Sequence, residues 1–196
     1  MEGATRFWWV RHAPVDAAPG EIVGVLDRPC RAMDAAAVSA LRHVLPPDAA
    51  AVTSGLARCR ATADALGFSQ AVTEPGLREQ DFGAWQGRTW ADLPFSETGD
   101  FWEAPATARP PGGESFADQV ARVRACIERL AEARAGHDVV AVVHAGTIRA
   151  ALALAMGLEA DPAPALCFGV EPLSLTRVDL VAEGAAVHLV NWRPRP

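Results

Sequence analysis

The sequence predicts an α/β fold, a three-layer αβα sandwich in which helices cover both faces of a mostly parallel central sheet. The prediction depends on short apolar runs that suit buried strands, which alternate along the chain with segments that suit helices. The clearest run, Val139–Val143, is far too short to span a membrane. With 196 residues, half of them hydrophobic, the chain is long enough to bury the core of one domain.

The first half of the chain supplies three of the predicted strands. Phe7–Val10 is an apolar run that ends at Arg11-His12, and a loop rich in proline, glycine and aspartate follows it to about residue 31. Ser54 precedes a helical segment and is a plausible N-cap. The elements expected up to residue 73 are a strand at 7–10, a helix at 33–45, a strand at 49–53, a helix at 54–66 that stops at Gly67, and a strand at 71–73.

Residues 74–113 form the least regular part of the sequence. Glycine and proline interrupt the segment repeatedly, yet it carries many phenylalanine and tryptophan side chains. A disordered tether would not contain so many large apolar groups. We therefore expect a partly helical, lid-like excursion at about 74–113 within a single domain that spans residues 1–196.

Regular structure returns at Ser115, which forms a variant of the capping box with Asp118. Large apolar residues then recur at helical spacing and predict one buried helix face; they are Phe116, Val120, Val123, Ile127 and Leu130. The remaining predictions are a strand at 138–143, a helix from His144 to about 156, and a closing hairpin formed by 173–181 and 186–192.

The charge and cysteine content exclude several classes of function. The net charge is −6 and no run of basic residues stands out, so we expect neither nucleic acid nor a membrane as a partner. The four cysteines, Cys30, Cys59, Cys126 and Cys167, are widely separated and show no metal-like pairing, so we expect them to be reduced and mostly buried. No signal-like segment opens the sequence, which makes a cytoplasmic location the expectation.

Cationic and imidazole side chains follow three of the predicted strands. Arg11-His12 ends the first strand, Arg58 comes shortly after the second, and His144 ends the fourth. Because the carboxyl ends of parallel strands meet at one edge of a sheet, we expect these groups to converge there. Two arginines and nearby helix N-termini suit a phosphate group, and a neutral imidazole can attack phosphorus.

A phosphoryl-transfer site also needs a proton donor for the leaving group. Glu79 is the best-placed carboxylate, and Asp81 is the competitor for this role. The tryptophans of the excursion, Trp85, Trp90 and Trp102, either pack the lid or provide a surface on which an aromatic or sugar group of the substrate stacks.

Five segments, in the order in which they occur, resemble motifs of the histidine phosphatase superfamily in its phosphoglycerate-mutase-like branch. They are Val10-Arg11-His12-Ala13; the Ser54 to Ala63 stretch with Arg58 and Thr62; Leu77-x-Glu79-x-x-Phe82-Gly83-x-Trp85-x-Gly87; Gly112-Gly113-Glu114-Ser115 followed by Arg122-Val123; and Val143-His144-Ala145-Gly146-x-Ile148-Arg149. One such motif would be a weak signal, but five in order over most of the chain form a specific one.

The resemblance implies a phosphoglycerate-mutase-like fold and phosphoryl transfer without a metal or other cofactor. In the superfamily's pattern, His12 would be the nucleophile and Glu79 the proton donor. Arg11, Arg58 and His144 would bind the phosphate, and His144 would also stabilise charge on the transferring group.

The expected activity is metal-independent hydrolysis of a phosphomonoester through a phosphohistidine. Mutases of the superfamily have a longer insertion after the glutamate motif, which disfavours mutase-type phosphoryl transfer. Gly24-x-x-Asp27-x-Pro29 and the stretch from Phe101 to Ser115 look most like the alpha-ribazole phosphatase group, so we expect alpha-ribazole phosphate or another small phosphorylated metabolite as substrate. The alternative from another class is a non-catalytic phospholigand-binding module on the same fold.

Overall fold

The computed structural model describes residues 3–193, in which a central sheet has the strand order β3-β2-β4-β1-β5-β6. The strands are β1 (Thr5–Arg11), β2 (Ala50–Thr53), β3 (Val72–Thr73), β4 (Asp138–Val143), β5 (Leu175–Val181) and β6 (Gly184–Trp192). Neighbouring strands from β3 to β1 are parallel, whereas β5 runs antiparallel to both β1 and β6. The predicted mostly parallel sheet is confirmed.

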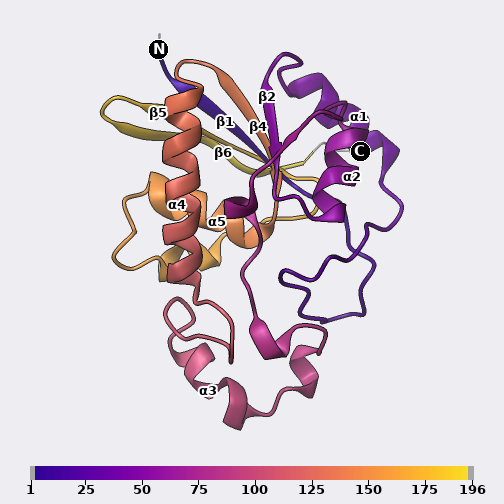
Figure 1. The fold of residues 1–196 in the computed structure, drawn as a ribbon, viewed down its shortest axis with the longest axis vertical. Helices are drawn as coiled ribbons and strands as arrows, with labels where there is room; N and C mark the ends of the chain where they lie inside the picture. Colours follow the sequence, from indigo (N-terminus) through magenta and orange to yellow (C-terminus); the bar gives the residue numbers. More distant parts are fainter. Residues whose placement is uncertain (1–2, 194–196) are drawn as a thin grey trace.

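Helices cover both faces of this sheet (Figure 1). They are α1 (Ala35–Val44), α2 (Ala57–Ala65), α3 (Phe95–Glu103), α4 (Phe116–Ala133) and α5 (Ala145–Ala155), with short 3-10 helices at Pro75–Leu77, Gly83–Trp85, Trp90–Asp92 and Ala163–Cys167. The α1 and α2 helices pack on one face, and α4 and α5 pack on the other. The predicted three-layer αβα arrangement is therefore confirmed. In the described part of the chain, no helix is both long and apolar enough to cross a membrane.

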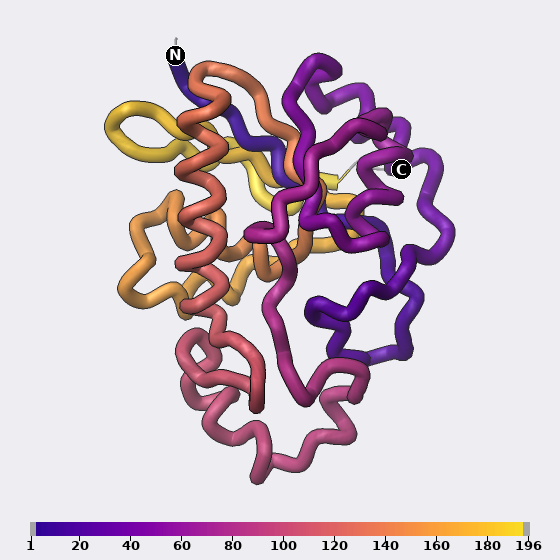
Figure 2. Tube along the Cα trace, in the orientation of Figure 1, coloured from indigo at the N-terminus to yellow at the C-terminus, as the bar shows by residue number. Residues whose placement is uncertain are grey.

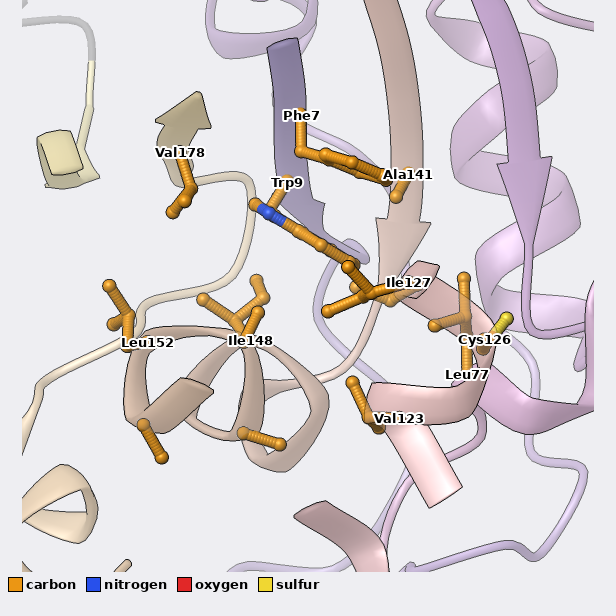
Figure 3. Close-up of a cluster of buried hydrophobic side chains, with 14 of the residues drawn as sticks. Phe7, Trp9, Leu77, Val123, Cys126, Ile127, Ala141, Ile148, Leu152 and Val178 are labelled. Carbon is orange, nitrogen blue, oxygen red and sulfur yellow. The ribbon is translucent and has the colours of Figure 1, made fainter. Parts of the chain in front are cut away.

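Alternate residues of the central strands serve the two faces of the sheet. In β1, Phe7 and Trp9 point toward α4 and α5, where their rings stack with centroids 5.3 Å apart (Figure 3). Val10 belongs to the core on the opposite face, with α1 and α2. Side chains from both faces of β4 are buried as well, which explains the continuous apolar run that predicted this strand.

Side chains cap the starts of α1, α2 and α4. Asp34 caps α1, and Ser115 with Asp118 forms the expected capping box of α4. The expectation that Ser54 caps the following helix is wrong, because Gly55, at a φ of +84°, turns the chain away and α2 begins only at Ala57. The Ala57 N–H instead donates to Asp27 Oδ1 over 2.6 Å.

The lid, defined as residues 74–113, extends beyond the carboxyl ends of the parallel strands (Figure 2). It contains α3 and three of the 3-10 helices. Three of its buried side chains form a separate small core with Ile22 of the loop at 14–31; these are Trp85, Leu93 and Phe101. A bridge between Glu21 and Thr89 also joins that loop to the lid. The lid and the loop therefore form one packed structure over the end of the sheet.

Candidate active site

Strand register brings the functional residues together. In the parallel pair of β1 and β4, Arg11 is opposite Val143, and the His12 N–H donates to the Val143 carbonyl over 2.9 Å. In the pair of β2 and β4, Thr53 is opposite Val142. The residues just after β1 and β4 are thus neighbours, and the rings of His12 and His144 meet edge to face with centroids 5.0 Å apart.

A cleft of about 280 Å³ opens at this end of the sheet, between the strand ends, the 14–31 loop and the lid. It is lined by Arg11, His12, Pro14, Val15, Glu21, Ile22, Val23, Gly24, Arg58, Glu79, Phe82, Trp90 and Pro172. Four of the five residues proposed from the sequence for the phosphate chemistry therefore share one cleft. The fifth, His144, is fully buried directly behind His12.

His12 presents a defined tautomer to the cleft. Its Nδ1 lies 2.7 Å from the carbonyl oxygen of Ala13, which can only accept, so Nδ1 carries the proton and Nε2 keeps its lone pair. Burial lowers the pKa of His12 to about 3, and the positive charges of Arg58 and Arg11 act in the same direction. The imidazole is therefore neutral near pH 7 and its Nε2 is a competent nucleophile.

His144 is held by Ser54 at the end of β2. Its Nε2 lies 2.8 Å from Ser54 Oγ, and Cys59 Sγ lies 3.4 Å from the same nitrogen. Burial lowers the pKa of His144 well below its ordinary value, and the positive charges of Arg58 and Arg11 add to this effect. Ser54 is thus a positioning residue for His144, a role that its place after a strand did not predict.

The two arginines are anchored by backbone carbonyls. Arg11 donates through Nη1 to the carbonyl of Val170. Arg58 donates through Nη1 to Leu26 and through Nη2 to Gly24, each over 2.6 Å, and so fixes the 14–31 loop at the cleft. Burial lowers the pKa of both guanidinium groups, which remain cationic because an arginine pKa is so high. The cleft is thus positively charged where Arg11 and Arg58 meet His12.

The Glu79 carboxylate is fixed by contacts on both oxygens. Oε1 accepts from Gln119 Nε2 over 3.1 Å, and Oε2 accepts from the Gly146 N–H over 3.2 Å at the start of α5. Asp81 instead accepts from the Gly83 N–H over 2.8 Å and does not line the cleft. Between the two carboxylates considered from the sequence, the geometry favours Glu79 as the group that faces a substrate.

Residues around the site fix the turn after β1 and the connection from the sheet to the lid. Thr62 Oγ1 accepts from the Ala13 N–H over 3.0 Å and so ties the turn after β1 to α2. Arg122 pairs with Glu114 and donates to the Gly76 carbonyl over 2.7 Å, which fixes the strand-to-lid connection to α4.

The role of Gln119, which donates to Glu79, was missed from the sequence. The signal in the sequence was a glutamine within the otherwise apolar face of α4, and the structure buries this side chain fully.

The lid tryptophans occupy different environments. Trp90 lines the cleft beside Phe82, whereas Trp85 is 2% exposed and packs inside the lid core. Trp102 is 55% exposed and lies outside the cleft lining. Of the two alternatives raised for the lid tryptophans, stacking on a substrate does not fit Trp85 or Trp102, because neither residue lines the cleft. Trp90 alone of the three is placed to touch a substrate.

Metal binding was not expected, and no clustered ligand set occurs in residues 3–193. No group of three or more histidine, cysteine, aspartate or glutamate side chains in that range is arranged to hold a metal ion. The cysteines Cys30, Cys59, Cys126 and Cys167 are all free thiols. The positive charge of the cleft comes from Arg11 and Arg58.

Comparison with known proteins identifies the family of the chain. Residues 7–193 match the family model described as the histidine phosphatase superfamily, branch 1. The chain belongs to the histidine phosphatase superfamily. A bifunctional protein of Mycobacterium tuberculosis is 36% identical over 149 residues, which cover 73% of this chain and 40% of that protein. The chain thus spans less than half the length of that curated relative.

Solved structures show the same fold in phosphatases of the superfamily. A mycobacterial glucosyl-3-phosphoglycerate phosphatase superposes with a TM-score of 0.81 at 28% identity, covering 96% of this chain and 99% of that one. An alpha-ribazole phosphatase from Shigella flexneri superposes with a TM-score of 0.82 over 96% of both chains. Its 24% identity establishes the shared fold alone.

Proposed function

We propose that this histidine phosphatase superfamily member hydrolyses phosphomonoesters of small metabolites, with His12 as the nucleophile. The single observation that carries the proposal is the environment of His12. Its ring is buried, neutral and bonded through Nδ1 to Ala13, and its Nε2 is the free nitrogen beside Arg11 and Arg58. The phosphatase names of two solved relatives agree with the proposal.

In the first step, the Nε2 lone pair of His12 attacks phosphorus and the bond from phosphorus to the ester oxygen breaks. The charge on the transferring group is stabilised by Arg11 and Arg58, since both guanidinium groups reach this part of the cleft. Glu79, in its protonated form, gives its proton to the departing oxygen. The products are an alcohol and a phosphohistidine at His12.

In the second step, water replaces the alcohol. The Glu79 carboxylate takes a proton from this water as its oxygen attacks phosphorus, and the bond from phosphorus to His12 Nε2 breaks. Inorganic phosphate is released, and both His12 and Glu79 return to their starting protonation states. We propose that His144 supports the phosphoryl group from behind His12, where Ser54 holds it.

Two alternative functions, a mutase and a non-catalytic binding module, fit the site less well. A mutase would return the phosphoryl group to a second hydroxyl, so release of inorganic phosphate separates it from a phosphatase. A non-catalytic phospholigand-binding module would not need an unprotonated, fixed imidazole at the centre of its phosphate pocket. Alpha-ribazole phosphate and glucosyl-3-phosphoglycerate are substrates to test, since relatives are named for them.

The decisive test is the His12→Ala substitution. Phosphate release should fall by roughly 10³-fold or more because the attacking nitrogen is lost. Vanadate or inorganic phosphate should still bind, since Arg11 and Arg58 remain. The matched control is His43→Ala, which removes an exposed histidine on α1 and should leave turnover unchanged.

Two outcomes would contradict the proposal. Phosphate release that survives in His12→Ala would exclude His12 as the nucleophile. Turnover that EDTA abolishes in the unmodified protein would show that the reaction depends on a metal. Protein that is incubated with an ester radiolabelled in its phosphoryl group and then quenched in alkaline denaturant should carry an alkali-stable, acid-labile label on the native chain and none on His12→Ala.

A further inference from the structure

The wall of the phosphate cleft contains a carboxylate, Glu21, to which the proposed reaction assigns no role. Glu21 lines the cleft, and its side chain is 8% exposed. Its Oε2 accepts from the Ala18 N–H over 3.0 Å, and its Oε1 accepts from Arg28 Nη2 over 2.8 Å. These two contacts keep the pKa of Glu21 below its ordinary value, so the group is anionic near pH 7.

The cations of the cleft are already assigned to the phosphate. Among the lining residues that the structure describes, Arg11 and Arg58 are the cations, and both lie beside His12. Arg28, the partner of Glu21, is not part of the lining, and its side chain is 45% exposed. A second anionic group on the substrate would therefore lie near Glu21, and no further cation of the lining would be available to pair with it.

The remaining wall of the cleft is apolar. Phe82 and Trp90 face it from the lid, and their rings meet edge to face with centroids 6.0 Å apart. Ile22 and Val23, which follow Glu21 in the chain, and Pro172 also line the cleft. Such a wall suits an alcohol with a flat or apolar face, which gains from contact with aromatic rings.

We propose that Glu21 is a specificity-determining residue that restricts the substrates to monophosphate esters of alcohols without a second negative charge. The proposal rests on the phosphatase function proposed above and names the substrate class for that same cleft. It favours a nucleoside-like or other uncharged alcohol and disfavours phosphoglycerate-type substrates, which carry a carboxylate. Specificity here comes from a repulsive element as much as from contact.

The expected size of the effect follows from the charge and its screening. A fixed carboxylate a few ångströms from a second anion in a partly buried cleft disfavours binding, and Arg28 offsets part of this repulsion. We expect discrimination of about tenfold at low ionic strength, falling as salt is added. Since the repulsion acts on the bound substrate and on the transition state alike, it should appear mainly in KM.

The test compares three esters that share one aromatic ring. Phenyl phosphate has an uncharged leaving group, 3-carboxyphenyl phosphate adds a carboxylate, and 3-(aminomethyl)phenyl phosphate adds a cation. The unmodified protein should hydrolyse the carboxylate ester with a kcat/KM about tenfold below that of phenyl phosphate. The cationic ester should be hydrolysed at least as well as phenyl phosphate.

Two substitutions should shift this discrimination in opposite directions. Glu21→Gln removes the charge while its amide oxygen can still accept from Ala18, so the ratio between phenyl and carboxyphenyl ester should fall toward one. Arg28→Gln removes the counter-charge, so the ratio should rise. Glu97→Gln is the matched control, because Glu97 is an ion-paired lid carboxylate outside the cleft and its loss should leave the ratio unchanged.

The outcomes separate this inference from the proposed function. Equal kcat/KM for the three esters, or a ratio that Glu21→Gln leaves in place, would overturn the role of Glu21 while phosphatase activity stands. Failure of the unmodified protein to release phosphate from any ester would overturn the proposed function and the inference together. A shift caused equally by Glu97→Gln would assign the effect to net charge and overturn the role of Glu21.

Discussion

His12 stays neutral because its surroundings oppose protonation from several directions. Its ring is buried, and Arg11 and Arg58 add positive charge nearby. The Ala13 carbonyl accepts the Nδ1 proton and partly offsets these effects. His144, fully buried behind it, is kept neutral in the same way. The cost of burying two uncharged imidazoles is small compared with that of burying two charged ones.

These lowered pKa values predict a pH-dependent stability. The folded pKa of His12 is about 3 and the unfolded one about 6.5, so between them only the unfolded chain binds the proton. The stabilisation is complete above about pH 6.5 and is lost as the pH falls, by up to about 1.4 kcal/mol per pH unit for one group. Urea denaturation between about pH 5 and 6.5, above the carboxylate range, measures this slope.

Substitutions assign the slope to the buried imidazoles. His12→Asn should flatten the dependence of the unfolding free energy on pH in this interval, because the residue that titrates only in the unfolded chain is gone. His43→Asn removes an exposed imidazole and should leave the slope unchanged. An unchanged slope in His12→Asn would contradict the lowered pKa.

At the scale of elements, the start of α5 fits closely against Glu79. The Gly146 N–H donates to one Glu79 oxygen, and a Cβ at residue 146 would overlap the other oxygen and the side chain of Gln119. A glycine is thus required here for close approach and not for an unusual backbone angle. Gly146, from the motif around His144, and Glu79, from the motif that begins at Leu77, therefore contact each other directly.

The Gly146→Ala substitution should displace the Glu79 carboxylate. A shift of about 1 Å in a catalytic group can lower kcat by roughly 10²-fold, and phosphate binding at Arg11 and Arg58 should be retained. Steady-state kinetics and vanadate binding measure the two effects. Gly99→Ala in α3 is the control, because the atoms nearest to the added methyl belong to the ring of Phe95, which is 72% exposed. Full activity in Gly146→Ala would exclude a role for this contact.

At the scale of the whole molecule, the lid has a core of its own. Phe101 packs against Trp85 and Trp90 with centroids 5.3 and 5.7 Å apart, and the two main cores lie on the faces of the sheet. The lid is joined to the core under α4 and α5 through Leu77 and Ala106, and to the 14–31 loop through the bridge from Glu21 to Thr89. A defect in the lid core should therefore remain local.

The Phe101→Ala substitution tests this separation. Loss of a buried phenylalanine removes about 3 kcal/mol of packing, which should loosen the lid and raise KM through the displacement of Trp90. Hydrogen exchange should become faster in the lid and stay slow in β1 and β4. Phe95→Ala, an exposed position in the same helix, is the control and should change neither. Equal loss of protection throughout the sheet would show that the lid is part of one cooperative core.

The local sequence pattern was sufficient to predict most of the helices and strands. The strands at 7–10 and 138–143 were predictable because side chains on both of their faces are buried, so their apolar runs are continuous. The α4 helix was predictable from its apolar face and from the Ser115–Asp118 box. The Ser54 cap failed because the turn at Gly55 depends on the fit to Thr73 and the rest of the sheet, which local propensity does not contain.

By itself, the sequence determined the fold class and the superfamily motifs, since both depend on residue types and on spacing along the chain. The tertiary structure alone decided which nitrogen of His12 is free and that Ser54 holds His144. It also decided that Glu79, and not Asp81, lines the cleft. Each of these depends on contacts between residues far apart in the sequence, and strand register and helix packing create those contacts only when the whole chain has folded.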